Sequence, residues 1–257
     1  MAKVFIKNGF LRFLYWFAVV VFSAGVLLSA VMLGYYYYDS HNSVAKYEEL
    51  ASSIESPTST TSAEERPEPL EIYAPILEQN KDFVGWIFIE GTRVNYPVLQ
   101  RMDSKNYYLR RSFDGKYSYY GVPYAFEKAT FEEADNFVIF GHHMDNGSMF
   151  SDLANYVSWQ FYEEHKYIQF DTIDAYGRYE VIAVVKTVAG GADEFEYHEF
   201  AKAQTPEEFD AFVAECKERS LYPIETTATY GDKLLTLSTC EYSVENGRLA
   251  VIAKKIS

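Results

Sequence analysis

An uninterrupted apolar stretch near the N-terminus constrains this chain more than any other feature. Residues 13–38, FLYWFAVVVFSAGVLLSAVMLGYYYY, contain no charged side chain. About 20 apolar residues are enough for a helix to cross a bilayer, whereas the apolar core of a cleaved signal peptide spans only about 7–15 residues. A buried helix of a soluble protein would not need apolar residues on every face. We therefore expect an uncleaved transmembrane signal anchor over residues 13–38.

Charge on the two flanks of this segment predicts its orientation. Residues 1–12 carry three basic side chains, Lys3, Lys7 and Arg12, and the acidic Asp39 follows the span. Because positive flanks stay in the cytoplasm, we expect a basic cytoplasmic flank and a chain that otherwise faces outward. The whole chain has a net charge of −14, and such a surface repels a phosphate backbone, which argues against nucleic acid as a partner.

Composition changes again after the apolar segment. Residues 39–69 include ASSIESPTSTTSAEERPEP (51–69), which is rich in Ser, Thr, Pro and Glu. Such a segment cannot bury enough apolar surface to offset the entropy lost on ordering. We therefore expect a flexible linker, or stalk, over residues 39–69, in which residues 41–50 could continue the helix. Residues 70–257 then form the folded domain.

The folded domain has the pattern of a mostly β protein with added helices. Aromatic residues, which favour strands, make up 18% of the chain. β-Branched residues and period-2 patches predict strands at 84–91, 136–143, 166–171, 178–188, 233–240 and 248–256. Short strands with irregular connections favour a barrel or a sandwich. We also expect a short helix from about residue 71 and a longer one over 205–220, where Thr205, Pro206 and Glu208 match a capping box.

The two cysteines of the chain have different settings. Cys216 lies on the single apolar face of the helix 205–220, which predicts a buried, inert thiol. Cys240 ends the strand 233–240, just before a polar loop that leads to Arg248. Neither cysteine lies in a Cys-x-x-Cys pair, and nothing resembles a zinc cluster.

Antiparallel pairing of the last two predicted strands would bring Cys240 and Arg248 together at one edge of the sheet. Only the thiolate attacks well, and a fixed positive charge nearby favours the anion. An arginine can also stabilise an oxyanion that forms on a carbonyl. Cys240 is therefore a candidate nucleophile with a cationic helper; the alternative is that Arg248 is a solvated charge at a strand end.

A nucleophilic thiol also needs a proton carrier. His142 and His143 directly follow Gly141 at the end of a predicted strand, and the rim of a barrel is a suitable place for reactive groups. The other histidines lie in the membrane-proximal segment, at the end of a charged helix and in an acidic connection: His41, His165 and His198. The pair 142–143 therefore supplies the candidate, with ordinary hydrogen-bonded histidines as the alternative.

Several segments together resemble the sortases, the transpeptidases of Gram-positive cell surfaces, and in particular their class B. They are TLSTC (236–240) with its downstream arginine, the histidine segment NFVIFGHHMDNGSMFSDL (136–153) and the early strand region GWIFIEGTRVNYPVLQ (85–100). The helix 205–220 lies where class B members insert a long helix before the cysteine strand. The resemblance covers about residues 70–257 and implies a closed β-barrel preceded by an N-terminal transmembrane helix.

The resemblance also implies which side chains carry the chemistry. The family nucleophile, arginine and histidine fall, in that order, on Cys240, Arg248 and His142. His143 is then the neighbour of the histidine that directly follows glycine. Ser238 and Thr239 precede the cysteine, and we expect them to order the pocket or the substrate. Glu241, the acidic residue after the cysteine, is given no catalytic role.

The reaction and its partners follow from the same resemblance. The thiolate attacks the threonine carbonyl in a C-terminal sorting motif of a secreted protein, the arginine steadies the oxyanion, and the histidine protonates the departing amine. An amine of a lipid-linked peptidoglycan precursor then resolves the thioester. This chemistry needs no cofactor or metal, so we expect none. The expected location is the cell membrane, with the catalytic domain outside the cell.

Three other functions stay open at this point. A hydrolytic cysteine peptidase would use the same residues, and dependence of product formation on an amine separates it from a transpeptidase. A non-catalytic surface-binding module would have an unreactive thiol and tolerate Cys240→Ala. A pilus-polymerising enzyme would join its substrate to a lysine on a pilin.

Overall fold

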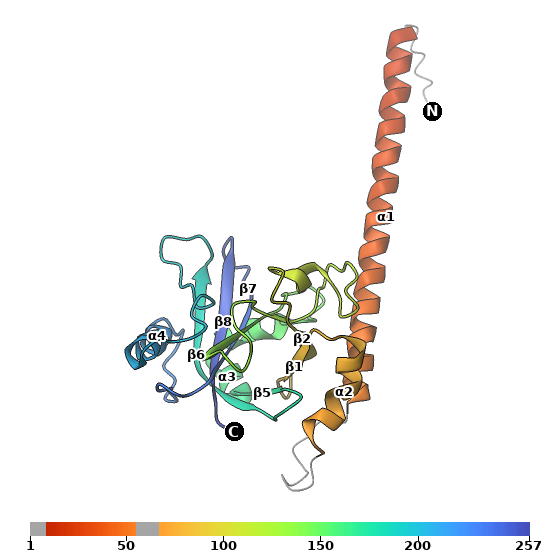
Figure 1. Ribbon diagram of the computed structural model, residues 1–257. Coiled ribbons are helices and arrows are strands. Elements are labelled where there is room, and N and C mark those ends of the chain that lie inside the picture. Colours follow the sequence, from red (N-terminus) through yellow and green to blue (C-terminus); the bar gives the residue numbers. More distant parts are fainter. Residues whose placement is uncertain (1–8, 55–66) are drawn as a thin grey trace. The chain divides into compact units, whose positions relative to one another are not determined.

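The computed structural model describes residues 9–54 and 67–257 (Figure 1). The chain divides into two compact units, one ending at Asn42 and one spanning Ser43–Ser257. The predicted positions of Lys3 and Lys7 in a cytoplasmic flank lie outside the described residues, as does the 55–66 part of the predicted linker. The boundaries predicted at residues 12, 38 and 69 stay predictions.

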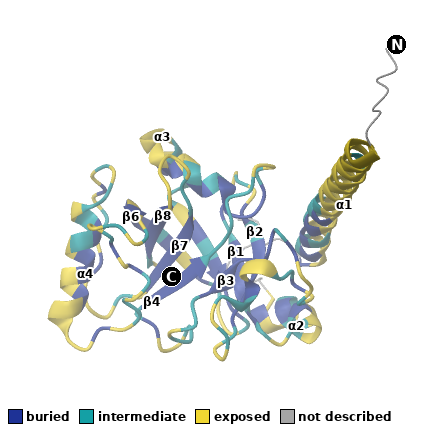
Figure 2. Ribbon diagram, turned by 90° about the horizontal axis from the view of Figure 1, so that it is seen from above, coloured by how far each residue is buried: buried dark blue, intermediate teal, exposed yellow. Residues whose placement is uncertain are grey.

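Helix α1, Gly9–Ser53, contains the apolar segment. Its most apolar window of 18 residues has a mean hydropathy of 2.4, and none of that window is buried. By length and composition it is a candidate membrane span, and almost all of residues 9–38 are exposed (Figure 2). An all-round apolar helix is what a lipid environment accommodates.

The last turns of α1 belong to the second unit; the sequence predicted a flexible linker from residue 39, in which residues 41–50 could continue the helix. Residues 39–53 are helical. The buried side chains recur at intervals of four, three and four residues, which places them on one face of the helix: Ser43, Tyr47, Leu50 and Ile54. This stripe has about one buried residue per turn among polar neighbours, so composition alone does not reveal it.

The second unit contains a closed barrel of eight strands, which confirms the predicted barrel. The strands are β1 (Phe83–Phe88), β2 (Asn95–Leu99), β3 (Tyr124–Ala125), β4 (Asn136–Phe140), β5 (Tyr167–Asp171), β6 (Arg178–Val188), β7 (Leu234–Cys240) and β8 (Gly247–Lys255). Their order around the barrel is β1-β2-β3-β4-β7-β8-β6-β5, and β5 closes on β1. Every strand therefore has a neighbour on both sides, although β2 and β3 meet at a single pair. Strands β6, β7 and β8 carry the longest ladders (Figure 1).

Two pairings position the residues of interest. Strands β7 and β8 are antiparallel, as predicted from the loop between them. Strands β4 and β7 are parallel, with Phe140 opposite Ser238. The carboxyl ends of β4 and β7 therefore meet at one rim of the barrel, together with the start of β8.

The sequence analysis did not identify β2 and β3. Strand β2 contains Pro97, which lacks an N–H group and argues against a central strand. In the structure β2 is fully paired only with β1, and its other edge meets β3 at a single position, Leu99 opposite Tyr124. The missing donor of Pro97 is tolerated because that edge is almost unpaired. Strand β3 has two residues, too few for a period-2 pattern.

Three α-helices and two 3-10 helices complete the second unit. They are α2 (Pro69–Gln79), η1 (Tyr107–Arg110), η2 (Ser151–Val157), α3 (Trp159–His165) and α4 (Pro206–Glu218). The apolar face of α4 packs on β6 and β8, with Cys216 fully buried among them. Burial raises the pKa of the Cys216 thiol, and both cysteines are free. The prediction of a buried thiol in this helix is confirmed, and its inertness stays a prediction.

The start of α4 differs in detail from the predicted capping box. Thr205 is the N-cap, and its hydroxyl accepts a hydrogen bond from the Glu208 amide at 3.3 Å. The Glu208 carboxylate, however, accepts from the amide of Gln204 at 2.6 Å and not from that of Thr205. The carboxylate thus binds one residue earlier than in the standard box.

Candidate active site

Cys240 and Arg248 lie directly opposite each other where β7 ends and β8 begins. They are paired positions in the antiparallel ladder, so their side chains leave the same face of the sheet. The connecting loop turns at Asn246, which has a φ of 57°. A Cβ on Gly247 would collide with the carbonyl of Glu241. The glycine therefore allows the close approach of the two chain segments that places Arg248 opposite Cys240.

The guanidinium of Arg248 has few partners of its own. Its Nη1 donates to the carbonyl of Gly247 at 2.9 Å, and among the described residues no carboxylate forms an ion pair with it. Most of its five donors are therefore available to a ligand.

His142 follows β4 by two residues. The parallel ladder is extended by Gly141, whose amide donates to the Ser238 carbonyl at 3.0 Å. The hydroxyl of Thr239 donates to the Gly141 carbonyl at 2.8 Å. If the same register continued by one more residue, the backbone of His142 would lie opposite that of Cys240. A Cβ on Gly141 would lie 2.5 Å from the ring of Phe150, so glycine is required before the histidine.

The imidazole of His142 binds a loop and not the thiol. Its Nε2 lies 2.7 Å from the carbonyl of Leu109 in η1. A carbonyl oxygen only accepts, so Nε2 carries the proton and Nδ1 of the neutral ring is left as the acceptor. Burial lowers the pKa of His142; the bond to Leu109 opposes this effect and the charge of Arg110 adds to it. Within residues 67–257, no hydrogen bond joins His142 to Cys240.

His143 contacts the same rim from the other side. Its Nδ1 lies 3.2 Å from the backbone carbonyl of Cys240. Its ring packs on Tyr242, with centroids 4.9 Å apart, and the Tyr242 hydroxyl donates to the carbonyl of His143 at 2.8 Å. His143 therefore connects the histidine segment to the end of β7 through the backbone of Cys240, and to the loop after β7 through Tyr242.

Ser238 and Thr239 are part of strand β7 and are almost completely buried. The Ser238 hydroxyl lies 2.6 Å from the hydroxyl of Tyr197, and that of Thr239 is held by Gly141. Both hydroxyls are thus used inside the protein. Of the two roles expected for these residues, their burial favours ordering the pocket over direct contact with a substrate.

Two tyrosines that the sequence analysis did not single out lie within electrostatic reach of the pair. Burial raises the pKa of Tyr197 to about 12; the bond to Ser238 and the charge of Arg248 lower it, and the charge of Cys240 raises it. Burial also raises the pKa of Tyr124; the charge of Cys240 raises it further, and the charge of Arg248 lowers it. Both tyrosines are far from Cys240 in sequence, so no spacing rule would have found them.

Glu241, next to the candidate nucleophile, is engaged by its neighbours. Its carboxylate accepts from Lys186 of β6 at 3.2 Å and from the amide of Ser243 at 3.2 Å. Burial alone would raise the pKa of Glu241, but the bonds from Ser243 and Lys186 outweigh it and lower the pKa. These contacts tie the loop after β7 to strand β6.

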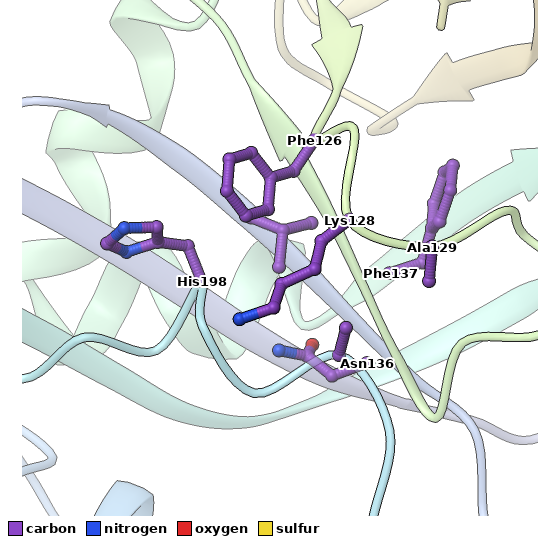
Figure 3. A pocket seen from close by; sticks show the side chains of 8 residues that line it. Phe126, Lys128, Ala129, Asn136, Phe137 and His198 are labelled. Atoms are coloured by element: carbon purple, nitrogen blue, oxygen red, sulfur yellow. The ribbon is translucent and has the colours of Figure 1, made fainter. Parts of the chain in front are cut away.

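A small pocket lies beside the first residues of β4, between Phe126, Lys128, Asn136 and His198 (Figure 3). Its volume of about 10 Å³ is close to that of a single water probe. It is too small to hold a peptide. Within the described residues, no group of three or more His, Cys, Asp or Glu side chains could hold a metal ion.

Comparison with known proteins identifies the family of this chain. A family model described as Sortase domain matches residues 87–256. Sortase B of Staphylococcus aureus is 32% identical over 225 residues, which are 86% of this chain and 87% of that protein. Sortase B of Listeria monocytogenes is 32% identical over 181 residues, 69% of this chain and 71% of that protein.

Solved structures have the same fold. A Staphylococcus aureus sortase B–substrate complex matches with a TM-score of 0.74 and 29% identity, over 86% of this chain and 99% of that chain. Sortase B of B. anthracis matches with a TM-score of 0.72 and 27% identity, over 86% and 99%. The barrel and the family match define the class of protein: the chain belongs to the sortase family. Its similarity to sortases B over most of its length assigns it to class B of that family.

Proposed function

We propose that this protein is a membrane-anchored cysteine transpeptidase that cleaves a C-terminal sorting motif of secreted proteins after threonine. It joins the threonine carboxyl group to an amine of a cell-wall precursor. Membership of the sortase family supports the reaction class. The observation that carries the assignment of residues is the direct pairing of Cys240 with Arg248 at the end of β7, with His142 two residues beyond the end of the neighbouring strand β4.

In the first half-reaction the Cys240 thiolate attacks the threonine carbonyl. The C–S bond forms as the electron pair of the carbonyl moves to oxygen, and the fixed charge of Arg248 stabilises that oxyanion. The tetrahedral intermediate collapses by breaking the C–N bond. The proton of the thiol has passed to His142 before the attack, and the departing amine takes it from the resulting imidazolium, because an unprotonated amide nitrogen is a poor leaving group. A thioester on Cys240 remains.

In the second half-reaction an amine attacks the thioester. His142, now without the donated proton, accepts one from the attacking amine, and the C–S bond breaks to regenerate the thiolate. Since Nε2 of His142 is bound to Leu109, either Nδ1 acts or the ring turns from that carbonyl when substrate binds. Ser238 and Thr239 keep β7 and β4 in register at the point of attack.

The location follows from helix α1. As an uncleaved anchor with residues 1–12 in the cytoplasm, it holds the barrel on the outer surface of the membrane. A tether raises the effective concentration of the barrel near secreted substrates and lipid-linked precursors. The long apolar helix supports this anchoring.

The test incubates the full chain in detergent micelles with a panel of fluorogenic sorting peptides, with and without an added amine. We expect amine-dependent product from wild type, and loss of cleavage in Cys240→Ala, His142→Ala and Arg248→Ala. Product that forms equally well without amine would identify a hydrolytic peptidase. Cleavage that survives in Cys240→Ala would refute the mechanism. Cys216→Ala is the matched control, since its thiol is buried in α4.

A further inference from the structure

The membrane-proximal turns of α1 contact a loop that carries the partner of His142. This loop, residues 106–121, includes η1 and returns to the barrel at Gly121. On one side Ser43 and Tyr47 approach it: the two hydroxyls of Ser43 and Ser118 lie 3.4 Å apart, and the Tyr47 hydroxyl donates to the carbonyl of Gly121 at 2.7 Å. The loop is thus held from the side of the helix.

The opposite side of the 106–121 loop faces the site. Leu109 offers its carbonyl to Nε2 of His142 at 2.7 Å, and Asn106 accepts from the hydroxyl of Tyr124 at 2.9 Å. Gly121 packs tightly under η1, because a Cβ there would lie 2.7 Å from the carbonyl of Leu109. Its φ of 60° also favours glycine. Displacing Gly121 therefore displaces the oxygen that holds the imidazole.

A second set of contacts leads from the same tyrosine to the histidine segment. The ring of Tyr47 packs edge-on against Tyr96 of β2, with centroids 5.6 Å apart. The hydroxyl of Tyr96 accepts from the amide of Met149 at 2.9 Å. Met149 forms a β-bridge with His143, and the next amide, of Phe150, donates to the carbonyl of His142 at 2.9 Å.

We propose that Tyr47 is a positioning residue for His142. Its hydroxyl holds the loop whose carbonyl binds the imidazole. Its ring packs on Tyr96, whose hydroxyl holds the segment that also binds the His142 backbone. Tyr47 is 3% exposed, and neither its hydroxyl bond to Gly121 nor its ring contact with Tyr96 reaches a reacting group, so it acts on His142 through intervening residues. The inference rests on the proposed function, because His142 must first be the proton carrier.

The position of a proton donor matters for one leaving group and not for another. An amine must receive a proton as the C–N bond breaks. A thiolate with a pKa of about 8.5 leaves from a thioester without one. Misplacing His142 should therefore slow acylation of Cys240 by an amide peptide and spare acylation by a thioester of the same peptide. Loss of folded protein would lower both rates by the same factor.

The experiment measures single-turnover acylation of Cys240 by mass shift in the full chain in micelles. The substrates are the sorting peptide that wild type cleaves fastest and its thioester at the same threonine. Tyr47→Phe removes the hydroxyl and keeps the ring; we expect amide acylation to fall about 10-fold, and about 100-fold in Tyr47→Ala, with little change for the thioester. Tyr222→Phe is the matched control, since its hydroxyl also donates to a backbone carbonyl, that of Tyr156 at 2.6 Å.

The outcomes separate the inference from the function on which it rests. His142→Ala should show the selective loss for the amide; if it does not, the proposed role of His142 fails. If it does, and the Tyr47 variants slow both substrates equally or neither, Tyr47 is only a structural residue and the inference is overturned. Should Tyr47→Ala fail to fold, Tyr47→Phe decides. If Tyr222→Phe also slowed acylation by the amide and spared acylation by the thioester to the same extent, the inference about Tyr47 would be overturned as well.

Discussion

Replacing Leu50 by alanine tests whether the last turns of α1 are part of the folded unit or belong to a flexible linker. Leu50 is 2% exposed and lies on the buried stripe with Tyr47 and Ile54. Truncating a fully buried leucine costs about 2–5 kcal/mol. A domain of ordinary stability, about 5–15 kcal/mol, survives this loss in the folded state. A leucine in a solvated stalk would contribute almost nothing to the free energy of unfolding.

The assay is urea denaturation of a chain that begins at Ser43, which is the start of the second compact unit. Fluorescence of the two remaining tryptophans follows unfolding, because Trp86 in β1 is 2% exposed and loses its buried environment, whereas Trp159 is already 47% exposed. For a loss of about 3 kcal/mol and a slope of about 2 kcal/mol per molar, the midpoint falls by about 1.5 M.

Glu49→Ala is the matched control for this measurement. Its side chain is 73% exposed, one residue before Leu50, and its contact with Lys46 is 3.9 Å long. An exposed pair of this kind contributes little, so the midpoint should stay near that of the parent chain. If Leu50→Ala shifts the midpoint no more than Glu49→Ala does, the segment is not packed and the reasoning is refuted.

Three further results are expected. In the native protein a thiol reagent should modify Cys240 and spare Cys216, whose burial raises its pKa, with both reacting after denaturation; two reactive thiols in the native state would contradict the packing of α4. The NMR titration of His142, assigned with His142→Gln, should have its midpoint below about pH 6.5, because burial disfavours the imidazolium. Acidification through about pH 6.5 should therefore lower the free energy of unfolding, since the unfolded chain binds the proton more readily. A titration midpoint above about 6.5 would contradict this effect of burial. Gly141→Ala should reduce peptide cleavage about 10-fold or more, because its Cβ would push on Phe150 and displace His142, and activity like wild type would contradict that contact.

Most of the barrel was predictable because its strands carry their own pattern. The predicted strand 178–188 coincides with β6, and those at 233–240 and 248–256 differ from β7 and β8 by about one residue at their ends. Their antiparallel pairing was also predictable, since a short loop joins them. Local pattern and loop length therefore account for the position of Cys240 relative to Arg248.

Two other features have little or no local signal. The stripe on the last turns of α1 has only one buried side chain per turn. Because residues 51–69 after it are rich in polar side chains, the composition of the whole segment predicted a linker. The bond between His142 and the carbonyl of Leu109 involves a backbone oxygen, which every residue carries, so no residue type marks it. Such contacts depend on how loops return to the barrel, and composition and periodicity do not encode that path.

The histidine differs from the other two proposed catalytic residues in how the chain fixes it. Cys240 and Arg248 face each other within one hairpin, so seven rungs of the β7–β8 ladder determine their separation. His142 lies beyond the last rung of β4, which pairs with β7 across about a hundred residues of sequence. Residues past the end of a ladder are held by loop contacts alone, and here those contacts lead through the 106–121 loop to Tyr47. A change in α1 can therefore displace the imidazole of His142 while Cys240 and Arg248 keep their positions. This is why such a change should slow acylation by an amide and leave acylation by a thioester almost unchanged.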